Sequence, residues 1–206
     1  MVAIAERKTV KAKNKVALSD LVYEQIDGKA IYYRGYKDVL NGKKSLEEIM
    51  SCSDLQGILV SLLNGVLFSK IDRKQYILCS NEFGLHLGKK DNLGIDLAIF
   101  EKKNIEKLSG EYFKIAPKVV IEVDIKAFIE ITDYPAKEMD YIFDKSQKLL
   151  DFGVEKVFWV TTKTRKIFMA TQNQNWLIMD WGSTIEVMEN CKINLKEMLD
   201  EEEISY

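Results

Sequence analysis

Apolar residues recur every three or four positions between residues 55 and 67, where the chain alternates between core-type and polar side chains. This 3.6-residue period is typical of a helix that turns one face to a protein core. Ser45 and Glu48 precede it and fit a capping box, which satisfies free N–H groups at a helix start. The pattern predicts a helix that begins at Ser45 and runs through the apolar repeat. That repeat consists of Leu55, Ile58, Leu59, Leu62, Leu63, Val66 and Leu67.

Shorter β-prone runs fill much of the remaining chain, and turn-forming residues separate them. The run at 117–125 is almost continuously apolar, as in a central strand covered on both faces. The runs after residue 156 predict one strand that continues the sheet and an antiparallel extension. The turn-rich stretch 84–94 predicts a hairpin. The expected strands lie within 29–36, 74–80, 95–100, 117–125, 157–162, 165–171, 175–180 and 184–188.

Two further helices are expected, at 135–151 and at 194–200. Pro135 suits a first helical turn and Gly153 suits a C-terminal cap. The order of helix, strands, helix and strands predicts a mixed α/β (α+β) sheet flanked by helices, and not a regular βαβ repeat. Without an internal repeat or linker, residues 18–206 are expected to form one domain.

Two acidic residues interrupt the predicted strands. Asp96 stands between Ile95 and Leu97, and Glu122 stands between Ile121 and Val123. Buried carboxylates are costly unless they are paired, hydrogen-bonded or bound to a metal. If the two strands are neighbours, the acids converge and suit a hard divalent cation. The spacing equally fits Asp96 at a strand entrance facing water and Glu122 on the wet face of an edge strand.

Strand alternation adds two candidates, because residues two apart share a face. Asp124 would then point the same way as Glu122, and Lys126 would follow on that face.

The predicted helix 135–151 carries a lysine close to its apolar face. At about 100° per residue, Lys145 lies on the flank of that face, whereas Lys148 points away from it. Lys145 can therefore lean toward the sheet. A boundary lysine with only its stem buried fits the same geometry. The residues expected to form the buried face are Met139, Ile142, Phe143, Leu149 and Leu150.

Composition narrows the function classes. The formal net charge is -2, so binding to nucleic acid requires a local basic patch. Residues 1–17 are basic and are expected to form a flexible tail, either solvated or lying on DNA. His86 is the only histidine, which disfavours a Ser-His-Asp triad and a zinc site. No phosphate-binding glycine motif occurs, so no nucleotide cofactor is expected.

The three cysteines, Cys52, Cys79 and Cys191, lack paired spacing and are expected to be reduced thiols. No apolar run is long enough for a membrane span, and the N-terminus lacks a signal-peptide pattern. A cytoplasmic protein without membrane contact is therefore expected.

The ordered set of motifs resembles the PD-(D/E)XK nucleases, and in particular the small restriction-endonuclease-like proteins of the Uma type. The matching segments are GIDLAIF with Asp96, KVVIEVDI with Glu122, and Lys145 eight residues before Gly153 and Val154, followed by EKVFWV. The early segment YEQIDGKAIYY also resembles the opening strand of that family. The resemblance spans roughly residues 18–200.

This resemblance implies a restriction-endonuclease-like core and a metal-dependent endonuclease that acts on DNA. Asp96 and Glu122 would hold Mg²⁺ (or Mn²⁺), with the backbone carbonyl of Val123 as a further ligand. Lys145 would be the catalytic lysine, moved from the strand to the helix. A homodimer is also implied, since restriction-type nucleases often cut both strands as dimers.

The sequence departs from the family pattern at two positions. Ile95 replaces the proline before the aspartate, and Asp124 stands where the family's usual lysine would be. Asp124 therefore supports a rival hypothesis, a DNA-binding or assembly module that kept the fold and lost catalysis. Lys126 is the substitute lysine if Lys145 is too distant. Gln56, with Glu48 and Asp54, is a candidate for an additional site residue from the middle of the first helix.

Overall fold

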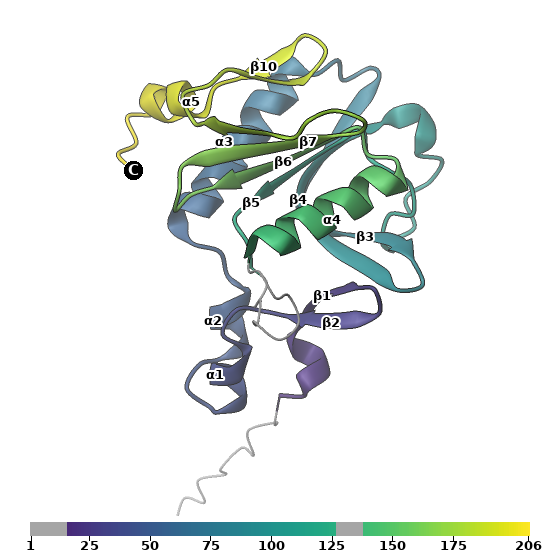
Figure 1. Cartoon of the computed structure of the whole chain (residues 1–206), viewed down its shortest axis with the longest axis vertical. Coiled ribbons are helices and arrows are strands. Elements are labelled where there is room, and N and C mark those ends of the chain that lie inside the picture. The colour runs from purple at the N-terminus through teal and green to yellow at the C-terminus, as the bar shows by residue number, and fades with distance from the viewer. Residues whose placement is uncertain (1–15, 127–137) are drawn as a thin grey trace, which may run out of the picture.

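A mixed β-sheet forms the centre of the protein, and helices cover both of its faces (Figure 1). The structure is a computed structural model that describes residues 16–126 and 138–206. Most of the expected basic tail, residues 1–17, lies outside the described residues, and so does Pro135. Within them, eight strands form the main sheet: β1 (Val22–Ile26), β2 (Lys29–Tyr32), β3 (Tyr76–Gly88), β4 (Asp91–Glu101), β5 (Val119–Val123), β6 (Lys156–Thr161), β7 (Lys166–Thr171) and β8 (Leu177–Asp180).

The strand order is β2-β1-β4-β5-β6-β7-β8, with β3 paired to β4 outside this path. Only β5 and β6 run parallel, and α4 (Glu138–Phe152) lies between them in the chain. A parallel pair needs such a crossover, whereas the antiparallel pairs are joined by shorter turns. The expected mixed sheet with flanking helices is confirmed.

The long strand β4 changes partner along its length. Near its start Asn92 pairs with Gln25 of β1, and from Leu97 to Ile99 it pairs with β5. Strand β3 pairs with β4 on its other side over nearly the whole length. The segment of β4 around Asp96 therefore lies where one neighbour ends and the next begins.

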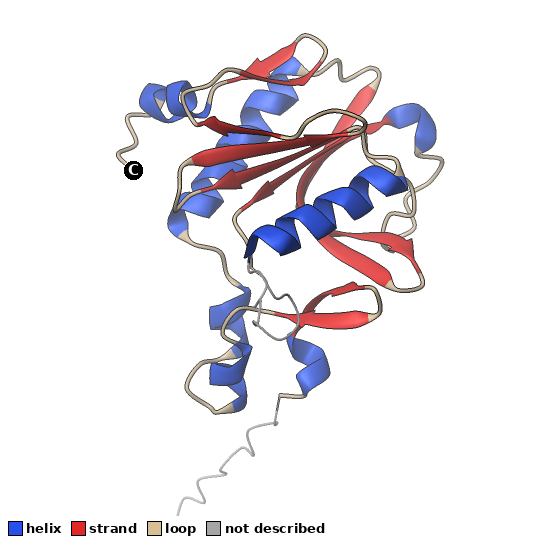
Figure 2. Cartoon of the chain, viewed as in Figure 1, coloured by secondary structure: helices blue, strands red, loops and turns tan. Residues whose placement is uncertain are grey.

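Two helices sandwich the sheet (Figure 2). Helix α3 (Asp54–Lys70) buries Leu59, Leu63 and Leu67 in one apolar cluster, as the 3.6-residue repeat predicts, whereas Ile58 of that repeat is exposed. Helix α4 packs on the opposite face through a second cluster. Strand β5 is buried at every position, which confirms that it is a central strand covered on both faces.

The helix expected to begin at Ser45 is in fact two helices. Ser45 caps α2 (Leu46–Met50) with Glu48 in the predicted capping box. The chain then leaves the helical conformation, and the Ser53 side chain caps α3 by accepting the Gln56 N–H. Two serines that cap separate starts explain the break, because capping residues favour non-helical backbone.

The run at 184–188 does not extend the main sheet. Strand β9 (Ile185–Met188) pairs with β10 (Cys191–Ile193) in a separate two-stranded sheet that packs over the α3 side. The residues 33–36, expected in a strand, instead lead into a helix. The remaining helical elements are η1 (Leu18–Leu21), α1 (Tyr36–Leu40), η2 (Lys102–Asn104) and α5 (Leu195–Glu201).

The cysteines Cys52, Cys79 and Cys191 are free thiols, as expected. Among the helices described here, none combines the length and the apolar character that a membrane crossing requires.

Candidate active site

Asp96 and Glu122 lie side by side on β4 and β5. A carboxylate oxygen of Asp96 (Oδ2) accepts the Val123 N–H at 2.9 Å, and the Asp96 N–H points to Oε2 of Glu122 at 3.5 Å. Their exposed fractions are 5% and 1%, so both acids are buried. The structure thus brings the two acids together and places neither on a wet strand face.

A β-bulge in β3 accompanies the position of Asp96. Asn81 and Glu82 form the bulge with positive φ angles, opposite Asp96 in the strand register. Across this point β4 changes its packing, since Ile95 joins the cluster on the α4 side and Leu97 joins the cluster on the α3 side. Bulges increase local twist and re-aim side chains. The bulge thus lies opposite Asp96, whose side chain lines a cavity together with Glu82 and Gln56.

Lys145 lies fully buried at the centre of the α4 face that packs on the sheet. Its ammonium Nζ lies 3.1 Å from Glu24 Oε2 and 3.0 Å from Glu122 Oε1, and it donates to the Gly94 carbonyl at 2.9 Å. An ammonium group has three donors. All three are therefore directed to protein oxygens.

The predicted buried face of this helix is confirmed at Ile142, Leu149 and Leu150 and is wrong at two positions. Met139 and Phe143, expected in the core, are 40% and 41% exposed. The buried face instead follows Tyr141, Lys145 and Leu149, a four-residue spacing that runs straight through the lysine. The prediction placed apolar residues such as Phe143 in the core. It did not expect the polar residues Lys145 and Ser146 there. Trp159 donates its indole N–H to the Ser146 hydroxyl, which makes that burial possible.

Glu24 on β1 completes the surroundings of Lys145. Its second oxygen accepts the hydroxyl of Tyr141, and its exposed fraction is 3%. The rings of Tyr23, Tyr141 and Trp159 lie 5.5–5.9 Å from the Lys145 ammonium. Aromatic faces attract cations at such distances. Two carboxylates and three rings thus enclose one positive charge.

The charges in this cluster shift one another's pKa values. Burial, together with the neighbouring Asp96 charge and against the opposing pull of Lys145, raises the pKa of Glu122 to about 8. Burial likewise raises the pKa of Asp96, although the hydrogen bond from Val123 opposes it. Burial disfavours the charged form of Lys145, but Glu122 and Glu24 outweigh it and raise its pKa. Burial therefore favours the neutral form of both acids, and for Glu122 the charge of Lys145 offsets only part of this effect.

A second lysine stands on the open side of Asp96. Lys126 Nζ lies 3.9 Å from Asp96 Oδ1 and forms an ion pair with Glu82 on the β3 bulge. A cavity of about 380 Å³ opens here, lined among others by Asp96, Lys126, Glu82 and Gln56. Lys126 lies beyond the end of β5, so it reaches the site through a loop and not through strand alternation.

Gln56 contributes from the first turn of α3, because the predicted single helix is divided. The prediction had placed it in the middle of that helix. Its buried amide donates from Nε2 to the Val123 carbonyl at 2.6 Å. A carbonyl oxygen has two lone pairs. The Val123 carbonyl therefore retains one lone pair for a further partner. Glu48 and Asp54 are exposed and lie at helix starts.

Asp124 does not share the face of Glu122, contrary to the expectation from strand alternation. The strand ends at Val123, and Asp124 adopts a φ of 60°. Its two oxygens accept the N–H and the hydroxyl of Thr162 at 2.7 and 2.6 Å. The side chain thus fastens the end of β5 to the end of β6. It stands outside the contacts that join Asp96 and Glu122.

The donor set fits a hard divalent cation in part. Within residues 16–126 and 138–206, no three side chains of His, Cys, Asp or Glu form a ready metal cluster. The available donors are the carboxylates of Asp96 and Glu122 and the Val123 carbonyl. Mg²⁺ commonly uses one or two carboxylates and keeps several waters. Burial is the main cause of the raised pKa values of both acids, and a bound cation would favour their ionised forms against it.

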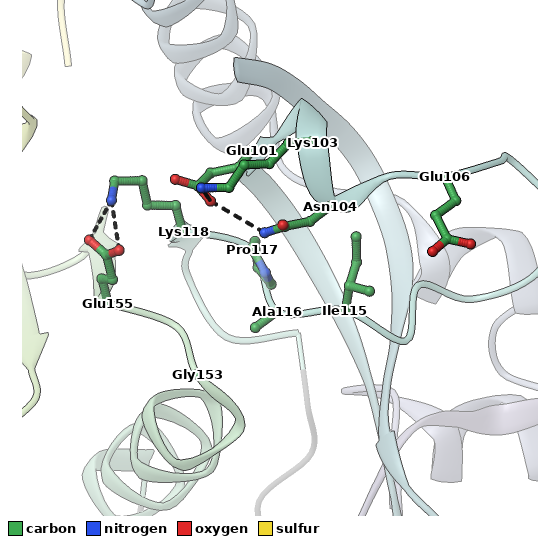
Figure 3. A pocket seen from close by; sticks show the side chains of 10 residues that line it. All are labelled: Glu101, Lys103, Asn104, Glu106, Ile115, Ala116, Pro117, Lys118, Gly153 and Glu155. Carbon is green, nitrogen blue, oxygen red and sulfur yellow. Dashed lines mark hydrogen bonds and ion pairs between the residues drawn. The ribbon is translucent and has the colours of Figure 1, made fainter. Parts of the chain in front are cut away.

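The structure contains another hollow away from these acids (Figure 3). This cavity of about 510 Å³ lies near the opposite end of β4 and next to Gly153. Its charges are largely paired, as Lys118 holds both oxygens of Glu155 at 2.6 and 2.7 Å. None of the candidate site residues lines it. It therefore offers no alternative reactive centre.

Two acids of the site were not selected from the sequence. Glu24 lies in the opening YEQIDG segment, and the family resemblance of that segment is the signal that the sequence offers for it. Glu82 gave no signal, because a bulge inside a long strand has no pattern in its residue types.

Comparison with solved structures gives a likeness in fold. A DUF820 protein from Anabaena variabilis, whose crystal structure is described as that of a "putative nuclease", matches with a TM-score of 0.61. The identity is 16%, and the match covers 90% of this chain and 94% of that protein. No family model matches the chain, and no curated protein matches it. The fold is therefore that of a nuclease-like α/β protein.

Proposed function

We propose that the protein is a metal-dependent endonuclease of the PD-(D/E)XK type, close to the Uma group, which hydrolyses phosphodiester bonds in DNA. The observation that carries the proposal is the contact of Asp96 and Glu122 with each other, with Lys145 bound to Glu122. The nuclease-like fold of the Anabaena variabilis protein supports it. The order of the acids and the lysine along the chain supports the same superfamily.

Lys145 acts on Glu122 and does not reach the substrate in this arrangement. Its three donors are directed to Glu24, Glu122 and Gly94, and its side chain has no exposed surface. An ammonium at 3.0 Å favours the ionised carboxylate of Glu122 against the burial that opposes it. Lys145 thereby offsets part of the effect of burial on the pKa of Glu122 and fixes the orientation of this carboxyl group.

Asp96, Glu122 and the Val123 carbonyl would hold Mg²⁺ or Mn²⁺. When bound, such a cation lowers the pKa of a water molecule and offsets charge on a phosphate. Gln56 orients the Val123 carbonyl through its 2.6 Å hydrogen bond. Lys126 lies on the cavity side of Asp96 and is the lysine placed to contact a phosphate oxygen.

The test combines calorimetry and cleavage. We expect Mg²⁺ to bind to the wild-type protein and supercoiled DNA to be cut in Mg²⁺ or Mn²⁺. Asp96→Asn and Glu122→Gln should each abolish cleavage and weaken Mg²⁺ binding at least tenfold. Glu155→Gln, an exposed acid beside Lys118, serves as the matched control and should leave both unchanged. Full cleavage by both site variants would reject the proposal.

A second candidate function is a DNA-binding or assembly module without catalysis. The engagement of every Lys145 donor within the protein favours it, as does Asp124 at the family's lysine position. In that case the buried ion pairs serve the fold alone. Absence of divalent binding in the calorimetric titration, together with DNA binding in EDTA, would select this function.

The proposed endonuclease would work as a homodimer if it cuts both strands of a duplex. Sedimentation of the protein with and without DNA would reveal that state. A monomer that nicks only one strand would remove the dimer and keep the catalytic proposal.

A further inference from the structure

A larger cavity adjoins the space over Asp96. It has a volume of about 700 Å³ and shares Met50, Asn81 and Glu82 with the smaller cavity that holds Asp96 and Lys126. We call the larger one the tyrosine cavity, because Tyr23, Tyr33 and Tyr112 line it. If the charged group of a ligand lies beside Asp96, the adjoining group of that ligand therefore reaches the tyrosine cavity.

Tyr112 presents a flat aromatic surface at this cavity. The side chain is 56% exposed, yet three of its ring atoms lie so close over Gly84 that a Cβ there would overlap them. The neighbouring backbone is fixed to β3, since Phe113 N–H donates to the Gly84 carbonyl at 3.0 Å and His86 N–H donates to the Phe113 carbonyl at 2.8 Å. One side of the ring is thus supported and the other is accessible.

A chain of amides lies in the same cavity. The Asn92 amide donates to the Gln25 oxygen at 3.3 Å, and the Asn92 oxygen lies 2.6 Å from His86 Nδ1. Among the described residues, the Gln25 side chain accepts this hydrogen bond through its oxygen. Its NH₂ group is left to donate to a ligand. Amide side chains of this kind recognise the edges of nucleobases.

The charges of the lining select which part of a nucleotide enters. Among the described residues the lining includes Glu24 and Glu82 but no lysine or arginine. Glu24 is paired with Lys145 and Glu82 with Lys126, so the lining offers no cation to a phosphate, whereas a neutral planar ring needs none. The volume also falls within the range of about 300–1,000 Å³ that is usual for small-ligand sites.

We propose that the tyrosine cavity binds one unpaired nucleobase, stacked on Tyr112, next to the phosphodiester held at Asp96. This inference rests on the proposed nuclease function and adds a substrate class to it. A base inside a duplex is stacked on both faces, so it reaches Tyr112 only in a single strand or after extrusion. The preferred substrate is therefore single-stranded or locally unpaired DNA.

The experiment measures binding in EDTA, so that no cleavage occurs. The probe is a single-stranded oligonucleotide that carries 2-aminopurine, a base whose fluorescence falls when it stacks. We expect binding with quenching, and tighter binding of the single strand than of the matching duplex. Tyr112→Ala should weaken single-strand binding about tenfold or more and abolish the quenching, because base stacking on an aromatic ring contributes that much.

Three further variants make this test specific. Tyr112→Phe keeps the ring and should bind as the wild type does. Gly84→Ala keeps Tyr112 but displaces its ring, and it should weaken binding as Tyr112→Ala does. Leu108→Ala truncates another exposed apolar side chain of the same segment and should change nothing.

The possible outcomes separate the two proposals. Unchanged single-strand binding in Tyr112→Ala, or no binding by the wild type, would overturn the base site. Duplex binding that equals single-strand binding would overturn it as well. If Tyr112-dependent binding is observed but the wild type cuts no DNA in Mg²⁺ or Mn²⁺, the base site stands and the nuclease function fails.

Discussion

The two lysines of the site differ in what surrounds them. Lys145 belongs to a closed half beneath α4, where its ammonium forms buried ion pairs with Glu24 and Glu122 and Tyr141 donates to Glu24. Lys126 belongs to an open half with Asp96, where a cavity reaches the side chains. The difference separates two tasks. Under the proposed function, Lys145 orients an acid and Lys126 contacts the substrate.

The largest expected effect comes from the closed half. Lys145→Met would leave Glu24 and Glu122 buried without their cation, and breaking one partner of a buried ion pair costs about 3–5 kcal/mol. We expect the midpoint of urea denaturation to fall accordingly. Lys148→Met, on the same helix with a more exposed side chain, should cost about 1 kcal/mol or less.

A second substitution sharpens this result. Lys145→Met combined with Glu24→Gln removes one of the stranded charges, so it should recover part of the lost stability. If Lys145→Met alone is as stable as the wild type, the closed half has no role in holding charge.

The next effect concerns the open half. Lys126→Ala should lower the rate of DNA cleavage about 10²-fold, the usual loss for one donor that stabilises transition-state charge. Its unfolding free energy should change less than that of Lys145→Met, because Lys126 keeps some exposure and pairs mainly with the partly exposed Glu82. Steady-state kinetics and urea denaturation would measure both. Lys118→Ala is the control, as that lysine lies at the remote cavity.

The opposite result for cleavage rate and unfolding free energy would contradict the distinction between the two halves. A Lys126→Ala protein that loses stability and keeps activity would make the open half structural.

The smallest effect is expected at Asp124. Asp124→Asn keeps one acceptor for Thr162 and should cost about 0.5–1.5 kcal/mol in unfolding free energy. Mg²⁺ affinity should stay within twofold of the wild type, since the carboxylate faces β6. A larger loss of Mg²⁺ affinity, measured by calorimetry, would return Asp124 to the metal site.

Much of the fold and part of the site followed from local patterns. The central strand at 119–123 was predictable because its apolar run signals burial on both faces, and Glu122 stood out inside it. Lys145 was identified by its order relative to Gly153, but periodicity placed it on the flank. Helical periodicity assumes that charged residues avoid the core, and a lysine neutralised by two acids breaks that assumption.

The remaining contacts depend on features that residue types do not encode. The break between α2 and α3 moved Gln56 from mid-helix to a first turn. The end of β5 at Val123 reversed the direction of Asp124. The pairing of Glu24 with Lys145 joins β1 to α4 across most of the chain. Such long-range contacts follow from the assembled sheet and from no local spacing.

The enclosure of Lys145 also bears on how the protein folds. Its three acceptors come from β1, β4 and β5, and the Glu24–Tyr141 contact alone spans 117 positions of sequence. Contacts between distant parts of a chain form slowly, because they require closure of long loops. Until β1 has joined β4 and α4 has docked, Glu122 lacks the ammonium that favours its charge. The chemistry of the acids is thus a property of the assembled sheet and of α4 docked on it.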